Sequence, residues 1–113
     1  MECIFCKIAT KKIASKIVFE DDEYIAFNDI KPQAPVHVII IPKKHIDSLN
    51  YIEKEDNALI GGLLNIAKKI AYDQGVSETG YRTVINCNKD AGQEVFHIHL
   101  HLIGGRKMSW PPG

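Results

Sequence analysis

Residues 95–102 read Val-Phe-His-Ile-His-Leu-His-Leu, and from Phe96 onward apolar residues and histidines alternate strictly. Alternation with a period of two predicts a β-strand that is buried on one face. Successive side chains of a strand point to opposite faces, so His97, His99 and His101 are expected on one face, together with Val95. The opposite face, which we expect to enter the core, carries Phe96, Ile98, Leu100 and Leu102.

The other apolar segments predict further strands and one long helix. Strands are predicted over residues 17–20, 24–27, 36–41 and 81–87. The first two flank an acidic turn and form a hairpin, and the third is apolar enough to be buried on both faces. Apolar residues recur at three- and four-residue spacing over about residues 54–74, which is typical of an amphipathic helix, and a shorter segment is expected at 46–51. The fold class is therefore α+β, with an antiparallel sheet of about five strands, one long helix and one short helix.

Length and charge narrow the class of protein. The chain of 113 residues predicts a single domain, 1–113. Lys and Arg (14) balance Asp and Glu (14), so no overall field attracts a nucleic-acid polymer, whereas a single nucleotide needs only local donors. No apolar run approaches the ~18 residues of a membrane span, and the N-terminus lacks the pattern of a signal peptide. Three cysteines do not frame a disulfide-rich fold, and we expect a reducing, cytoplasmic location.

The histidine row does not form a three-histidine metal site by itself. At ~3.3 Å per residue, His97 and His101 of a regular strand lie roughly 13 Å apart, whereas zinc–nitrogen bonds are about 2.0–2.1 Å. One ion can take an adjacent pair but not both outer rings. A row of imidazoles is more useful as a nucleophile with flanking hydrogen-bonding groups, since each ring titrates near neutral pH.

Cys3-Ile4-Phe5-Cys6 is a C-x-x-C pair near the N-terminus. Such a pair is either a redox dithiol or half of a zinc site, because a tight turn can direct both sulfurs at one ion. The absence of a βαβ pattern around it disfavours redox chemistry. A zinc ion would need two further ligands.

Several segments together resemble the histidine-triad family, and in particular its Hint branch. The resemblance rests on the His-apolar-His-apolar-His-apolar-apolar pattern and on four further segments, Asp29-Ile30, Gln33–His37, Ile41–His45 and the ending Gly104-Gly105-Arg106…Trp110-Pro111-Pro112-Gly113. It implies the fold of that family and a homodimer in which the tail, residues 106–113, reaches the neighbouring subunit near its active site. It also connects Gly61-Gly62, which are costly in a helix, with helix–helix contact across the dimer.

The resemblance implies a hydrolase that cleaves the P–N bond of purine nucleoside phosphoramidates. By motif position His99 is the nucleophile and forms a nucleotidyl-histidine intermediate. His101 would assist the phosphate oxygens or the leaving amine, His97 would support the row, and His37 would orient it. None of these roles needs a metal.

The same resemblance implies the binding residues. The expected nucleotide contacts are Phe27, Asp29, Ile30, Asn86, Gly92, Gln93, Glu94, Val95, His99 and His101. Among them Asp29 would meet the ribose hydroxyls, and Phe27 and Ile30 would cover the base. In zinc-bearing members the ligands match Cys3, Cys6, His45 and His97, so residues 1–8 would form a structural Zn²⁺-binding N-terminus.

Two points stay open at the level of sequence. The Hint branch commonly has a small hydroxyl residue where this chain has Glu94, and a carboxylate there favours a cationic leaving group or points away from the substrate. The alternatives to a phosphoramidase are a dinucleoside polyphosphate hydrolase, a non-catalytic nucleotide- or zinc-binding regulatory protein, and a purely structural zinc protein. The Trp-Pro-Pro-Gly ending favours the Hint branch over the polyphosphate hydrolases.

Overall fold

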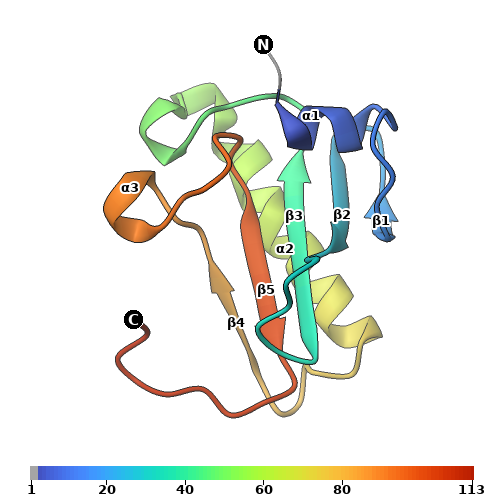
Figure 1. Cartoon of the computed structure of the whole chain (residues 1–113), viewed down its shortest axis with the longest axis vertical. Helices are drawn as coiled ribbons and strands as arrows, with labels where there is room; N and C mark the ends of the chain where they lie inside the picture. Colours follow the sequence, from blue (N-terminus) through green and yellow to red (C-terminus); the bar gives the residue numbers. More distant parts are fainter. Residues whose placement is uncertain (1–2) are drawn as a thin grey trace.

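The computed structural model describes residues 3–113 and confirms an α+β fold built on a five-stranded antiparallel sheet (Figure 1). The strands lie in the order β1-β2-β3-β5-β4. Their bounds are β1 (Ile17–Glu20), β2 (Tyr24–Asn28), β3 (Val36–Pro42), β4 (Tyr81–Val84) and β5 (Leu100–Gly104). β3 lies at the centre and pairs with β2 on one side and with β5 on the other, as its continuous apolar sequence predicts.

Helices cover the two faces of the sheet unequally. The long helix α2 (Asn57–Asp73) packs along one face, and the short helix α1 (Ile4–Ala9) lies at one end of the other face (Figure 1). The remaining helical turns are α3 (Asn88–Ala91) and the 3₁₀ turns η1 (Leu49–Tyr51) and η2 (Lys54–Asp56). The predicted long helix is confirmed, although its first turn is 3₁₀. The short segment expected at 46–51 corresponds to η1.

The side chains of β3 divide the core into two parts. Val38 and Ile40 face α2 within one cluster of buried residues, while Ile39 and Ile41 face α1 within the other. This alternation follows directly from the geometry of a strand. The face that carries α1 is only partly covered, and the functional site lies there.

The histidine row is less regular than predicted. β5 begins at Leu100, so the expected strand over residues 95–102 is wrong for its first half. There the chain bends, and Ile98 donates its N–H to the carbonyl of Ile46 (2.7 Å) instead of joining the sheet. Phe96, expected in the core, is 48% exposed. Ile98, Leu100 and Leu102 are buried, as predicted.

A contact within the same chain explains why residue 62 of α2 is glycine. A Cβ at this position would overlap the hydroxyl of Tyr24, which donates a hydrogen bond to the carbonyl of Leu59 (2.7 Å). A Cβ at Gly61 would meet no atom of residues 3–113 within 4 Å. The close approach inferred from the glycine pair is therefore made by Tyr24 at Gly62, and the homodimer stays a prediction.

Helix α1 was not expected from the sequence pattern. It begins after Cys3, whose sulfur accepts a hydrogen bond from the N–H of Cys6 (3.4 Å) and so takes the place of the usual hydroxyl or carboxylate cap. Its inward face carries Phe5 and Ile8, which are both buried. The helix holds the two cysteines of the C-x-x-C pair next to the histidine row.

Candidate active site and metal centre

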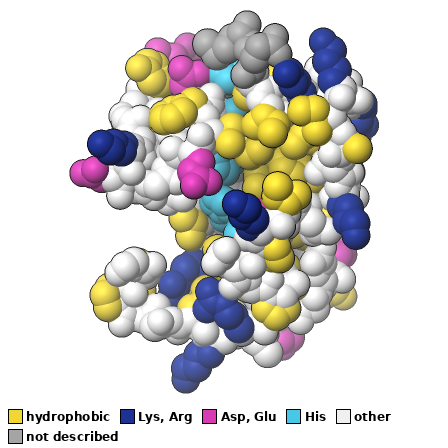
Figure 2. Space-filling model, viewed as in Figure 1, with side chains coloured by type: hydrophobic (Ala, Val, Ile, Leu, Met, Phe, Trp, Pro, Cys, Tyr) yellow, Lys and Arg dark blue, Asp and Glu magenta, His cyan; other side chains and the backbone are white. Residues whose placement is uncertain are grey.

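Four histidines line up on the α1 side of the sheet. His37 comes from β3, His101 from β5, and His97 and His99 from the bent segment that precedes β5. The ring centroids of His99 and His101 are 5.0 Å apart, and those of His37 and His101 are 5.1 Å apart. In Figure 2 histidine side chains lie along the floor of a groove, beside a hydrophobic patch.

A hollow of about 990 Å³ opens beside this row. Its walls include Phe27, Asp29 and Ile30, three of the residues predicted to hold a nucleotide, and also His37. Ile30 is 91% exposed, which leaves its side chain available to a ligand. The structure therefore brings these predicted residues together around one cavity.

The backbone fixes which nitrogen of His37 and His101 carries a proton. The N–H of Gln33 donates to Nδ1 of His37 (3.0 Å), so the proton of the neutral His37 ring resides on Nε2. That Nε2–H faces Nδ1 of His101 at 2.9 Å and donates to it. His101 therefore carries its own proton on Nε2. A second acceptor, the Asp29 carboxylate, lies 3.3 Å from Nε2 of His37.

His99 has the opposite tautomer to His37 and His101, because its Nε2 carries no proton. Nδ1 of His99 lies 2.7 Å from the carbonyl of His97, which can only accept, so Nδ1 carries the proton and Nε2 keeps its lone pair. His99 is 6% exposed, and Nε2 makes no hydrogen bond to the described residues. Since no buried side-chain nitrogen of these residues lacks a partner, Nε2 is the atom that solvent reaches.

Burial keeps the imidazoles of the row neutral. Desolvation lowers the pKa of His37 and that of His99 below the usual value. The pKa of His101 falls to about 4, mainly through burial and further through the like charges that His99 and His37 would carry. At pH 7 the row thus presents a free lone pair on His99 next to an N–H donor on His101.

The second feature is a cluster of Cys3, Cys6, His45 and His97, whose ligand atoms all lie within 4.8 Å of one another. Nδ1 of His97 is 3.4 Å from the sulfur of Cys3 and 3.5 Å from that of Cys6. Nδ1 of His45 is 3.4 Å from the sulfur of Cys6. Four ligands bound tetrahedrally to one zinc ion at about 2.0–2.3 Å are about 3.3–3.8 Å apart, so the spacing fits such an ion.

The hydrogen bonds around this cluster also fit a metal. Nε2 of His97 donates to the carbonyl of Pro42 (2.7 Å), and Nε2 of His45 donates to Oδ1 of Asp47 (2.7 Å). Both protons are therefore outside the cluster, and the two Nδ1 lone pairs face each other at 3.2 Å. Two facing acceptors repel unless a cation lies between them, and outer-shell partners of this kind are typical of metal-binding histidines.

A second group, formed by Asp29, His37 and His101, also brings ligand atoms within 4.8 Å of one another. It does not suit a metal. An ion on Nε2 of His37 would force the proton to Nδ1, where the N–H of Gln33 already donates. Hydrogen bonding explains this group completely.

The loop between β4 and β5 carries the other predicted nucleotide residues. Gly92 has φ +86°, a conformation that glycine adopts without strain, and Glu94 is exposed. Gln93 is buried, and its side chain is fully used inside the protein. Its Nε2 donates to the carbonyls of Asp47 (2.8 Å) and Val95 (3.1 Å), and its Oε1 accepts from the N–H of Asn88 (2.8 Å). The Gln93 side chain therefore fixes the loop, and the backbone adds to this, since the N–H groups of Gly92 and Gln93 donate to the carbonyls of Lys89 (3.0 Å) and Asn88 (3.1 Å).

Sequence reasoning missed the contribution of α1 to the hollow. Ile4, Phe5 and Ile8 line it, and the Phe5 ring lies edge-on to His99 with centroids 5.1 Å apart. The spacing of these apolar residues, i, i+1 and i+4 around the C-x-x-C pair, was the available signal.

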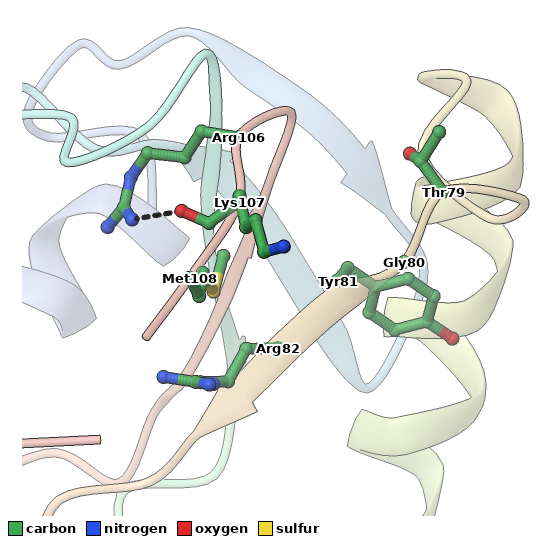
Figure 3. A pocket seen from close by; sticks show the side chains of 7 residues that line it. All are labelled: Thr79, Gly80, Tyr81, Arg82, Arg106, Lys107 and Met108. Carbon is green, nitrogen blue, oxygen red and sulfur yellow. Dashed lines mark hydrogen bonds between the residues drawn. The ribbon is translucent and has the colours of Figure 1, made fainter. Parts of the chain in front are cut away.

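A smaller hollow of about 200 Å³ lies away from the histidines, between the start of β4 and the C-terminal tail (Figure 3). Arg82 and Arg106 line it, but both guanidinium groups are engaged by backbone carbonyls. Arg82 donates to Ser109 (3.1 Å), and Arg106 donates to Gln33 (2.8 Å) and Lys107 (3.3 Å). These arginines secure the tail.

The sheet, the row of imidazoles and the extent of the sequence match define a known class. A family model described as "Scavenger mRNA decapping enzyme C-term binding" matches residues 2–110. The chain belongs to the histidine-triad (HIT) family and is a hydrolase of that family.

Its relatives cover nearly the whole chain. The crystal structure of a HIT family hydrolase from Legionella pneumophila is 55% identical with a TM-score of 0.98, covering 99% of this chain and 100% of that one. A histidine triad protein from Clostridium difficile is 45% identical with a TM-score of 0.93, over 96% and 95%. A purine nucleoside phosphoramidase from Escherichia coli is 47% identical over 95% of this chain and 90% of its own length. Within residues 3–113 no helix is long and apolar enough to span a membrane.

Proposed function

We propose that this protein hydrolyses the P–N bond of purine nucleoside phosphoramidates through a nucleotidyl-histidine intermediate on His99. The observation that carries the proposal is the pair of outward nitrogens: a lone pair on Nε2 of His99 next to an N–H on Nε2 of His101. The Escherichia coli relative with the matching activity in its name supports the choice of substrate.

The nucleoside occupies the large hollow. Phe27 and Ile30 offer apolar surface for a purine base, and the Asp29 carboxylate accepts from the vicinal hydroxyls of the ribose. Asp29 is already oriented, because its Oδ1 accepts from the N–H of Lys31 (2.8 Å) and its Oδ2 faces His37. A ribose bound there places the 5′-phosphate toward His99 and His101.

The phosphate is held by neutral donors. The backbone N–H groups of residues 94 and 95 and the side chain of Asn86 serve as donors to its oxygens, together with Nε2–H of His101. The N–H groups of Gly92 and Gln93 already donate to the carbonyls of Lys89 and Asn88. Gln93 keeps the loop in place through its three internal hydrogen bonds. Donors fixed in advance lower the cost of reorganisation when charge develops on the phosphate.

The reaction proceeds in two displacements. Nε2 of His99 attacks the α-phosphorus, the P–N bond breaks with its electron pair going to nitrogen, and the leaving amine takes up a proton from solvent. A water molecule then attacks the phosphorus and gives its proton to solvent, the bond to Nε2 breaks with its electron pair returning to that nitrogen, and nucleoside monophosphate leaves. The His97 carbonyl stabilises the ring through its bond to Nδ1–H while Nε2 is substituted. His37 holds His101 in its Nε2–H form throughout.

The exposed carboxylate of Glu94 is next to the phosphate-binding loop. A negative charge there favours leaving groups that carry a positive charge, such as the amine of a basic side chain, over anionic ones. This preference distinguishes the protein from a dinucleoside polyphosphate hydrolase, whose leaving group is an anion.

The cysteine–histidine cluster holds a structural Zn²⁺ ion. Its ligands would be Cys3, Cys6, His45 and His97, whose ligand atoms are close enough to bind one ion. The ion would supply cross-linking between α1, the segment after β3 and the histidine row, and the chemistry at phosphorus stays with His99.

The protein acts as a homodimer whose tail completes the neighbouring site. β4 is an edge strand, and an unpaired edge is a natural surface for pairing with a second copy. Trp110 in the tail is 80% exposed, while Arg82 lies over its ring at 5.8 Å. Light scattering at micromolar concentration tests this part, and a monomeric mass refutes it.

The decisive experiment compares His99→Ala with the unmodified protein on adenosine phosphoramidate. Turnover should be abolished, while AMP affinity stays within about tenfold, because only the covalent step needs Nε2. Ser77→Ala, on the segment after α2, serves as a matched control that keeps turnover. Near-normal turnover by His99→Ala refutes the assignment. Dinucleoside polyphosphates cleaved faster than phosphoramidates favour the polyphosphate hydrolase, and negligible turnover of both with intact AMP binding favours a regulatory protein.

A further inference from the structure

Helix α1 is too short to be stable by its own backbone hydrogen bonds. It has six residues, and isolated helices below about 12–15 residues are marginal in water. Its order therefore depends on what it contacts. Two sets of contacts are available, one around the two cysteines and one around Phe5 and Ile8.

One set is the cysteine–histidine cluster at the start of α1. Cys3 caps the helix and Cys6 lies in its first turn, and their sulfurs approach His97 and His45 at 3.4 Å. A metal ion there ties the first turn to two segments that are distant in sequence. Without the ion, the two sulfurs keep only weak hydrogen bonds to the histidines, while the two rings keep their Nε2 bonds to Pro42 and Asp47.

The other set is the large hollow, which α1 walls off with Ile4, Phe5 and Ile8. Phe5 belongs to both sets. Its ring packs edge-on against Phe27 (5.4 Å between centroids), against His99 (5.1 Å) and against His97 (6.1 Å). It also lies between the two cysteines in sequence, so any movement of the cysteines moves this ring.

We infer that metal occupancy of the cluster and nucleotide occupancy of the hollow are thermodynamically coupled through α1, with Phe5 as the coupling side chain. This inference rests on the proposed nucleotide site. A bound metal keeps α1 ordered, so the α1 wall of the hollow is already formed before the nucleotide binds. A bound nucleotide packs against Phe5 and keeps the cysteines in place, so the metal is retained. Coupling between two sites is reciprocal, and each ligand changes the affinity of the other by the same factor.

The test measures both directions with AMP as the probe. Calorimetry gives the AMP affinity of zinc-loaded and zinc-free protein, and we expect the loaded form to bind about tenfold more tightly, within the usual range of such couplings. Starting from the loaded protein alone, zinc release into excess EDTA is followed with and without saturating AMP. AMP should slow the release several-fold. This second measurement needs no folded zinc-free form.

Two variants separate coupling from general packing. Phe5→Leu keeps an apolar wall but removes the ring between the two sites, so the AMP effect on zinc release should fall below about twofold. Ile8→Val is the matched control, since Ile8 lies in the same helix and lines the same hollow without taking part in the ring contacts. It should keep the effect.

The outcomes are distinct. The coupling is overturned if AMP binds loaded and zinc-free protein tightly and with the same affinity, within twofold, and leaves the rate of zinc release unchanged. The proposed function stands in that case. Failure to bind zinc at all also overturns the coupling. Failure of the loaded protein to bind AMP overturns the proposed function and the coupling with it. Equal loss of the effect in Phe5→Leu and Ile8→Val overturns the role of Phe5.

Discussion

The two adjacent glycines of α2 allow a sharp test of the packing, because their surroundings differ. In Gly62→Ala the new methyl group would overlap the Tyr24 hydroxyl, and the ring carbon Cζ lies only 2.7 Å from the Cβ position. Tyr24 is 7% exposed and has little room to move. Overpacking a buried site costs about 1–3 kcal/mol, and displacing the hydroxyl also costs the hydrogen bond to Leu59, about 1 kcal/mol. Replacing glycine by alanine in a helix returns about 1 kcal/mol, so the net loss is about 1–3 kcal/mol.

Urea denaturation followed by circular dichroism measures this free energy of unfolding. Gly61→Ala is the matched control: its Cβ meets no atom within 4 Å in the part of the chain that the structure describes, and we expect stabilisation of about 0.5–1 kcal/mol. The double variant Tyr24→Phe/Gly62→Ala should recover only part of the loss, because the ring carbon remains close. A Gly62→Ala protein as stable as the unmodified one would show that Tyr24 moves aside at no cost, and the reasoning would fail. A Gly61→Ala protein that loses a dimer would instead place Gly61 at a subunit interface.

Three further predictions concern the site. The pKa of His101 is about 4 in the folded protein and about 6.5 in the unfolded chain, so folding stability falls as the pH drops through this window. This group alone should cost about 2 kcal/mol between pH 7 and 5. His101→Asn should make the free energy of unfolding depend less on pH in this range, and an unchanged pH dependence contradicts the shift. Asp47→Ala removes the acceptor of His45 and should weaken zinc binding about 10–100-fold in chelator competition, whereas Asp21→Ala, in the turn between β1 and β2, should leave it unchanged. Gln93→Glu replaces the amide N–H donor that bonds two carbonyls with an acceptor oxygen. It should lower kcat/KM on adenosine phosphoramidate at least about tenfold, which corresponds to a loss of about 1.4 kcal/mol or more. Unchanged kinetics would show that the loop is held by other contacts.

The sequence pattern predicted the sheet well, because the central strands are apolar enough to be recognised without their neighbours. It failed where tertiary contacts decide. The alternating pattern continues through residues 95–99, but the N–H of Ile98 donates to the carbonyl of Ile46 instead of to a neighbouring strand. The alternation of side chains carries no information about this backbone hydrogen bond. Helix α1 was missed because it is short and its cap is a cysteine, which is a typical metal ligand and an unusual helix cap.

The candidate site also has one part that the sequence predicted and another part that depends on tertiary contacts. The alternating motif identified His97, His99 and His101, and the family resemblance added His37. The resemblance also paired Cys3 and Cys6 with His45 and His97, which the structure places together. The wall formed by α1 and the internal role of Gln93 depend on contacts between segments that are 40 or more residues apart, such as the bond from Gln93 to Asp47. The roles of individual residues in catalysis stay predictions.

The proton on His101 is controlled by a backbone N–H, which substitution by alanine does not remove. The N–H of Gln33 decides the tautomer of His37, and His37 decides that of His101, so the order of protons in the row originates in a surface loop. Replacement of Gln33 by alanine would leave this order intact, and only a proline, which has no N–H, would disturb it. Scanning the loop with alanine would therefore report it as silent, although the loop sets which nitrogen of His101 can donate a hydrogen bond to a substrate.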